Sequence, residues 1–384
     1  MRYGGVPTSV RELCRGLSLA GLQVTLCSTT RGYNRTVDEP ADRFLISAGV
    51  DVRYFPYAQW PPVEKYLYSP SLASFLEREI RSVQILHLHT LWQHPILAAA
   101  RISRKAGVPY LISPCGVLDR YGFRIHPLFK RVYGWLVEKR TLMSAACLHF
   151  TSERERQQAY LFGTTLPLRI IPRGIRTEEI PPVPAGNFRK LYPEIGDRHI
   201  LLFLSRLHPK KRLDIVAQAF VLLAKRREDV HLVIAGPDDG VRGQAEAILM
   251  RGGVLHRSTI PGLLTGETKW AALRDAAVFL LPSEDENFGV SVLEAMACGT
   301  PVLVSDGVAL ADTIRNTEAG VVLEKDASRW AQTIGELLDD PPRRHRMGQA
   351  GRSLAKERFS STRLVAEMLG LYEEILSGRM AWSG

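Results

Sequence analysis

Two carboxylates flank the predicted start of a helix in the C-terminal half of the chain. Glu286 lies in an acidic loop that follows an apolar run at 278–281, and Glu294 lies eight residues later. The apolar run is typical of a buried parallel strand. Hydrophobic residues recur at helical spacing after Gly289, and Gly299 predicts the C-cap of that helix. The segment is therefore predicted to run strand, loop, helix and next strand, which is one unit of a doubly wound sheet.

This arrangement offers a site for a phosphorylated ligand. A helix N-terminus carries free N–H groups and the positive end of the helix dipole, both of which favour a phosphate. Glu294, about two helical turns beyond Glu286, would accept hydrogen bonds from two ribose hydroxyls, and Glu286 would meet a sugar beyond the phosphate. The alternative is an acidic loop followed by a solvated glutamate, and the spacing alone favours this alternative.

A basic segment lies between another predicted strand and helix, at 205–212. It reads Ser-Arg-Leu-His-Pro-Lys-Lys-Arg and so contains four cations. Cations at a helix N-terminus oppose the helix dipole, so they are best explained by an anion that binds there. The alternative is a solvated helix start.

The stretch around the carboxylates resembles the signature of retaining family-4 glycosyltransferases, which have the GT-B fold. The resemblance rests on Glu286, seven intervening residues and Glu294, together with the residues at 287–289 and 295–302. The family also has an arginine followed five positions later by a lysine, and Arg206 and Lys211 match this pattern. Arg212 stands where the family has a glycine.

The resemblance implies transfer of a hexosyl group from a UDP-, GDP- or similar nucleotide sugar, with retention at the anomeric carbon. Arg206, Lys211 and Glu286 are the implied catalytic residues: the two cations stabilise the leaving diphosphate, and Glu286 positions the hexose. Neither a metal nor a cofactor is implied. The full set of expected donor-binding residues is Gly4, Gly5, Arg206, Lys211, Glu286, Asn287, Phe288, Gly289, Val290 and Glu294.

The N-terminal half departs from the family in two places. Gly4 and Gly5 match a loop that approaches the donor phosphates, but the strand that precedes this loop in the family is absent. We therefore expect the first strand to be missing, with an upstream start of the natural gene product supplying it; the alternative is a flexible terminus. Cys115 stands where the family often has a sugar-contacting histidine, and a neutral thiol does not donate as imidazole does. His89 is favoured over His87 to face the acceptor or sugar, while a locally satisfied strand-end histidine is about as well supported.

Alternating strand and helix patterns predict an α/β protein with parallel sheets. With the resemblance, this becomes two facing Rossmann-like domains whose C-terminal helix crosses back to the N-terminal domain. We expect an acceptor domain at 1–177, a proline-rich linker at 178–197, a nucleotide-sugar donor domain at 198–360 and the crossover helix at 361–384.

The net charge of +10 belongs wholly to the N-terminal half of the 384 residues. Residues 1–184 hold 24 basic and 14 acidic side chains, whereas the remainder holds 26 of each. A predicted helix at 127–146 mixes cations with aromatic residues, which suits an anionic membrane surface. The alternative is that the charge serves solubility. We expect a cytoplasmic protein, peripheral on the inner face of the plasma membrane, that binds a glycan or lipid-linked saccharide acceptor and no nucleic acid.

Other functions are less well supported by the sequence. No Gly-x-Gly-x-x-Gly motif follows a predicted strand, which disfavours a dehydrogenase, and we find no pyridoxal lysine motif of a GT-B phosphorylase. The reading that we favour is a glycosyltransferase of cell-surface polysaccharide biosynthesis. Cys115 and the missing strand keep open a catalytically weak or inactive sugar-nucleotide-binding protein.

Overall fold

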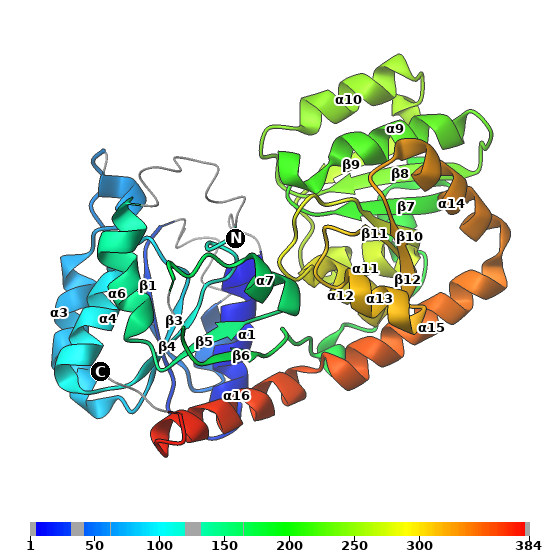
Figure 1. The fold of residues 1–384 in the computed structure, drawn as a ribbon. Coiled ribbons are helices and arrows are strands. Elements are labelled where there is room, and N and C mark those ends of the chain that lie inside the picture. The colour runs from blue at the N-terminus through cyan, green and yellow to red at the C-terminus, as the bar shows by residue number, and fades with distance from the viewer. Residues whose placement is uncertain (1–4, 32–41, 62, 120–131, 164, 381–384) are drawn as a thin grey trace. The chain divides into compact units, whose positions relative to one another are not determined.

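A computed structural model describes residues 5–31, 42–61, 63–119, 132–163 and 165–380. The chain divides into two compact units, one of residues 1–174 with 361–384 and the other of residues 175–360 (Figure 1). Both units combine parallel strands with helices, so the predicted α/β class is confirmed.

The first unit holds two parallel sheets in its described residues. One is the pair β1–β2, and the other has the order β3-β4-β5-β6. The strands are β1 (Thr25–Thr29), β2 (Asp51–Phe55), β3 (Leu86–His89), β4 (Tyr110–Ser113), β5 (Cys147–Phe150) and β6 (Leu168–Ile170). The α-helices include α1 (Gly5–Leu19), α3 (Pro70–Glu79), α4 (His94–Ala106), α6 (Lys139–Met143), α7 (Glu153–Gln158) and α16 (Ser361–Leu376), and a π-helical turn, η4 (Gly134–Glu138), precedes α6.

The C-terminal helix α16 belongs to the first unit, where it shares a buried cluster with α1. Leu13 and Leu17 of α1 pack in this cluster with Leu364 and Met368 of α16. Burial of these apolar side chains is the driving force that holds the last helix against the first.

A directed chain of hydrogen bonds also ties α16 to the larger sheet. His149 Nε2 lies 2.9 Å from the carbonyl oxygen of Ile171, which only accepts, so the proton is on Nε2. His149 Nδ1 therefore accepts from Ser113 Oγ at 2.6 Å, and Ser113 accepts from His87 Nε2 at 2.7 Å. His87 Nδ1 then accepts from the hydroxyl of Tyr372 at 2.9 Å. Burial lowers the pKa of both histidines, so both rings are neutral near pH 7, and this one carbonyl sets both tautomers.

The second unit contains a parallel sheet of order β12-β11-β10-β7-β8-β9 within residues 175–360, all of which are described. Its strands are β7 (His199–Leu204), β8 (Val230–Ala235), β9 (Ser258–Gly262), β10 (Ala276–Leu281), β11 (Val302–Ser305) and β12 (Gly320–Leu323). Its α-helices are α8 (Asn187–Leu191), α9 (Leu213–Ala224), α10 (Arg242–Arg251), α11 (Gly266–Asp275), α12 (Val290–Cys298), α13 (Ala311–Thr317), α14 (Ala327–Asp339) and α15 (Pro341–Arg358).

The strand order places a topological switch point between β7 and β10. The chain runs outward through β8 and β9 on one side of β7, and through β11 and β12 on the side of β10. In doubly wound sheets, ligands bind outside the carboxyl ends of the strands at such a point, because the loops there diverge. The two loops singled out in the sequence, 205–212 and 282–289, directly follow β7 and β10.

One segment differs from the sequence-based expectation. The prolines that indicated a linker at 178–197 lie in a segment built into the second unit. Phe188 and Ile195 are fully buried there, and Asp275 accepts hydrogen bonds from the N–H groups of Gly186 and Phe188.

Candidate active site

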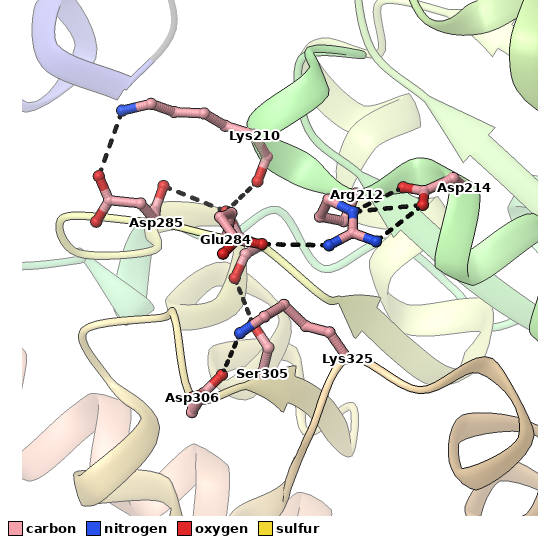
Figure 2. A network of polar contacts seen from close by, with 9 residues as sticks. Lys210, Arg212, Asp214, Glu284, Asp285, Ser305, Asp306 and Lys325 are labelled. Atoms are coloured by element: carbon pink, nitrogen blue, oxygen red, sulfur yellow. Dashed lines mark hydrogen bonds and ion pairs between the residues drawn. The ribbon is translucent and has the colours of Figure 1, made fainter. Parts of the chain in front are cut away.

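The loops after β7 and β10 are joined through one backbone carbonyl. Lys210 O accepts from the N–H of Glu284 at 2.7 Å and from the hydroxyl of Ser283 at 3.1 Å (Figure 2). These bonds fix the basic segment against the acidic loop, although more than 70 residues separate them in the sequence.

Three consecutive cations face three consecutive carboxylates across this junction. Each cation of 210–212 has a partner in 284–286, so the charges of the two triplets balance. The pairs are Lys210–Asp285 at 3.3 Å, Lys211–Glu286, and Arg212–Glu284 at 3.2 Å. A ligand that carries negative charge must therefore share these cations with the protein's own carboxylates.

The central pair consists of two of the predicted catalytic residues. The side chains of Lys211 and Glu286 are only 10% and 22% exposed, so water screens their attraction less than at an open surface. An ammonium group has three donors, so Lys211 can contact Glu286 and still donate to a bound anion.

The loop after β11 completes the support of Glu286. The N–H of Glu286 donates to the carbonyl of Gly307 at 2.9 Å, and its own carbonyl accepts from Ala309 at 2.9 Å. The hydroxyl of Ser305 donates to the carbonyl of Ser283 at 2.5 Å. Three loops at the carboxyl ends of β7, β10 and β11 thus hold this carboxylate in place.

Helix α12 begins where the sequence indicated. Gly289 is its N-cap and has a φ of 94°, a left-handed conformation that glycine adopts without steric cost. Gly299 ends the helix in the same conformation, as predicted. Phe288 is buried just before the helix, and Val290 is its first residue. The free N–H groups of this helix start therefore lie directly after the loop of Glu286 and Asn287.

Glu294 has a partner that sequence reasoning missed. Its Oε1 accepts from Lys269 Nζ at 2.8 Å, and this ammonium also lies 4.4 Å from the ring centroid of Trp270. Lys269 comes from α11, and no motif in the sequence links it to Glu294. The carboxylate predicted to hold ribose is thus oriented by a cation from a neighbouring helix.

Arg206 lies in the same loop as Lys211 but has a different partner. Its guanidinium pairs with Asp239, which follows β8, at 3.1 Å, and both side chains are nearly half exposed. Asp239 is a second neighbour that the sequence did not reveal. Binding of an anion by Arg206 would exchange one exposed carboxylate for another negatively charged group.

The other predicted site residues belong to the first unit. Gly4 lies outside the described residues, and Gly5 begins α1 with its carbonyl 3.0 Å from Arg173 Nη1. Cys115 follows β4 with a φ of 53°, and burial raises the pKa of its thiol to about 11. His89 stacks on His87 with ring centroids 4.1 Å apart, and burial lowers the pKa of His89 to about 3. Cys115 and His89 are therefore both neutral near pH 7.

Two further findings concern metals and membranes. Within the parts of the chain that the structure describes, histidine, cysteine and acidic residues form no group of three or more that could hold a metal ion. None of the helices found in those same parts is both long and apolar enough to span a bilayer.

Two family models match the chain, one on each unit. Residues 4–174 match the glycosyl transferase 4-like domain, and residues 186–354 match the glycosyl transferases of group 1. The chain therefore belongs to the family-4 type of glycosyltransferases, and its two units have the GT-B fold.

Among curated proteins, the chain is 27% identical to the D-inositol 3-phosphate glycosyltransferase of Xylanimonas cellulosilytica, over 98% of this chain and 93% of the relative. It is also 27% identical to the GDP-mannose-dependent alpha-(1-6)-phosphatidylinositol monomannoside mannosyltransferase of Mycolicibacterium smegmatis, over 83% of each chain.

Solved structures support the fold. Anabaena HepE in complex with UDP and glucose superposes with a TM-score of 0.78 at 15% identity, covering 97% of this chain and 96% of HepE. WaaG, a glycosyltransferase involved in lipopolysaccharide biosynthesis, gives 0.70 at 15% identity, covering 100% and 98%.

Proposed function

We propose that this glycosyltransferase moves a hexosyl group from a nucleotide-diphosphate sugar to a glycan or lipid-linked acceptor, with retention at the anomeric carbon. The observation that carries the proposal is the Lys211–Glu286 pair at the switch point, directly before the N-terminus of α12. The donor class is supported by the names of two similar proteins, one a GDP-mannose-dependent enzyme and one bound to UDP.

The proposed reaction replaces one bond at the anomeric carbon by another on the same face. The bond to the diphosphate oxygen breaks, the acceptor hydroxyl oxygen bonds to the carbon, and its proton goes to the leaving phosphate. Lys211, Arg206 and the N–H groups of α12 stabilise the negative charge that develops on the diphosphate. Glu286 positions the hexose, and Glu294 accepts from the ribose hydroxyls.

We propose that this chemistry needs no metal ion or cofactor. The leaving group requires positive charge, and Arg206 and Lys211 supply it together with the N-terminus of α12. Because side chains and backbone N–H groups provide this charge, the proposed reaction does not call for a metal ion at the diphosphate.

For the acceptor side, we propose that the first unit contacts an anionic membrane surface. The described part of the predicted helix 127–146 exposes Trp135 and Leu136 by 61% and 63%, beside exposed Val132. Lys139 Nζ lies 5.8 Å from the Trp135 ring centroid. The opposite face of this segment, with Gly134 and Leu142, is the buried one.

Exposed apolar side chains beside a cation suit a lipid interface. Contact with the membrane would deliver a lipid-linked acceptor of cell-surface polysaccharide biosynthesis. Lys130 and Arg131 of the same predicted helix lie outside the described residues.

The direct test is turnover of nucleotide sugars. UDP-glucose and GDP-mannose are incubated with the protein and a lipid extract, and release of nucleoside diphosphate is measured. Wild-type protein should release it, whereas Lys211→Ala and Glu286→Gln should release it far more slowly. Lys325→Ala is the matched control, because Lys325 pairs with Asp306 beside the same network but is not a proposed site residue (Figure 2).

A second function is favoured by Cys115, whose neutral, half-buried thiol replaces the histidine of the resembling family. If the protein is a sugar-nucleotide-binding module without turnover, nucleotide sugars will raise its melting temperature but no diphosphate will be released with any acceptor. That outcome would overturn the enzymatic proposal.

A further inference from the structure

The residue after Lys211 has an unusual backbone conformation. Arg212 is the N-cap of α9 and has a φ of 52° and a ψ of 46°. The left-handed region is unfavourable for residues with a Cβ atom, and arginine is not a preferred N-cap. The resembling family has glycine here. The contacts of the arginine side chain must therefore offset the unfavourable backbone.

Those contacts connect two elements. Arg212 Nε and Nη2 donate to Asp214 in the first turn of α9, each at 3.0 Å, while Nη1 donates to Glu284 at 3.2 Å (Figure 2). Only the planar fork of a guanidinium can present donors to two carboxylates in this way. Asp214 thereby aims the remaining amino group at the acidic loop.

Glu284 is the start of the loop that carries Glu286. The Arg212–Glu284 pair lies on one side of Lys211–Glu286 in the basic triplet, and Lys210–Asp285 lies on the other. With both flanking pairs formed, the acidic loop cannot slide along the basic segment without breaking a charged contact.

We propose that Arg212 is a positioning residue, whose guanidinium anchors the acidic loop to α9 so that Glu286 stays beside Lys211. This role rests on the proposed function, since it assigns Arg212 to the transfer of the hexosyl group through Glu286. It predicts opposite effects on stability and on activity. Arg212→Gly relieves the backbone but releases the loop, so transfer should fall while the melting temperature stays equal or rises.

Three variants, Arg212→Gly, Arg212→Lys and Glu284→Gln, separate the effect of the arginine's charge from that of its fork geometry and its contact with Glu284. Arg212→Lys keeps the charge but loses the fork, and Glu284→Gln breaks the same contact from the loop side. Arg227→Gly is the matched control, because Arg227 likewise joins two carboxylates of the second unit, Asp229 and Asp339. Three readouts are measured: melting temperature, hydrogen–deuterium exchange of peptide 282–289, and diphosphate release from UDP-glucose and GDP-mannose.

Arg212→Gly and Glu284→Gln should each speed amide exchange of the peptide by about tenfold and lower kcat by about fivefold. Their double variant should be no worse than either single one, because both remove one contact. Arg212→Lys should fall between Arg212→Gly and wild type. Arg227→Gly should lower the melting temperature and change neither exchange nor kcat.

Two results would overturn the inference. In one, Arg212→Gly keeps wild-type amide exchange and wild-type kcat. In the other, kcat falls only in those variants whose melting temperature also falls.

A different result shows that the proposed function itself is wrong: wild-type protein then releases no diphosphate from either donor. In that case the exchange of peptide 282–289 alone decides whether Arg212 anchors the loop.

Discussion

At the scale of single residues, Lys211 and Arg206 share a proposed role but differ in their surroundings. Lys211 is nearly buried against Glu286, whereas Arg206 is exposed and pairs with Asp239. Lys211→Ala should therefore lower kcat by about 10²–10³-fold. It should also destabilise the protein by about 1–3 kcal/mol, because the carboxylate of Glu286 loses this ion pair.

Arg206→Ala should lower kcat in the same assay without a measurable loss of stability, since exposed ion pairs contribute about 0–1 kcal/mol. Rates and urea unfolding curves of the two variants check both statements. Near-normal rates in both would exclude these cations from stabilising the leaving group.

Lys269 and Glu294 form a second pair whose role can be tested by binding alone. Glu294→Gln should lower the affinity for a nucleoside diphosphate by about tenfold, because the contacts to ribose are lost. Lys269→Met should lower this affinity less, because the carboxylate remains but is no longer oriented. Calorimetry compares UDP and GDP with inorganic diphosphate, which lacks ribose and should bind all three proteins alike. If the variants lost as much affinity for inorganic diphosphate as for UDP and GDP, the pair would act on the phosphates and not on the ribose.

At the scale of elements, the membrane proposal can be tested on the exposed apolar side chains Trp135 and Leu136 of η4. Burying Trp135 and Leu136 in a bilayer interface should contribute about 2 kcal/mol each. The double change Trp135→Ser and Leu136→Ser should therefore release the protein from anionic vesicles in co-sedimentation. Met250→Ser on α10 is the control, because Met250 is equally exposed in the second unit. Wild-type protein that stays in the supernatant at low salt would rule out the membrane role.

Across the whole molecule, buried neutral histidines make the fold sensitive to acid. Burial lowers the pKa of His149 to about 4 in the first unit and that of His231 to about 4 in the second. Unfolded histidine has a pKa of about 6.5, so the unfolded state binds protons first as the pH falls. Stability is therefore lost between about pH 6.5 and 4, by on the order of 3 kcal/mol per histidine. Urea unfolding at pH 7 and pH 5 should show this loss, and equal stabilities would contradict it.

Glu138 acts in the opposite direction. Burial raises the pKa of its carboxyl to about 7 from 4.5, so the native state holds the proton more tightly than the unfolded state. The stability that the protein gains from this raised pKa is fully present below about pH 4.5 and is lost as the pH rises through about 7. Glu138→Gln should therefore make the acid loss of stability steeper between pH 7 and 5. The amide oxygen can still accept from the N–H of Trp92, as Glu138 Oε1 does at 3.0 Å, and an unchanged slope would contradict the raised pKa.

Local pattern was sufficient for much of this protein. The apolar run of β10, the glycines at both ends of α12 and the alternation of elements predicted the α/β fold and the start and end of α12, because these signals act over a few residues. The spacing of Arg206, Lys211, Glu286 and Glu294 carried the family resemblance.

Partners across the sheet could be known only from the tertiary structure. Lys211 meets Glu286, and Lys269 meets Glu294, because strand order and helix packing make neighbours of segments that are distant in the chain. The exposure of Trp135 was undecided for a similar reason, since helical spacing alone does not tell which face packs on the sheet. The same holds for Arg212: its identity is visible in the sequence, but its left-handed backbone and its two carboxylate partners depend on the packing of α9 against the loop after β10.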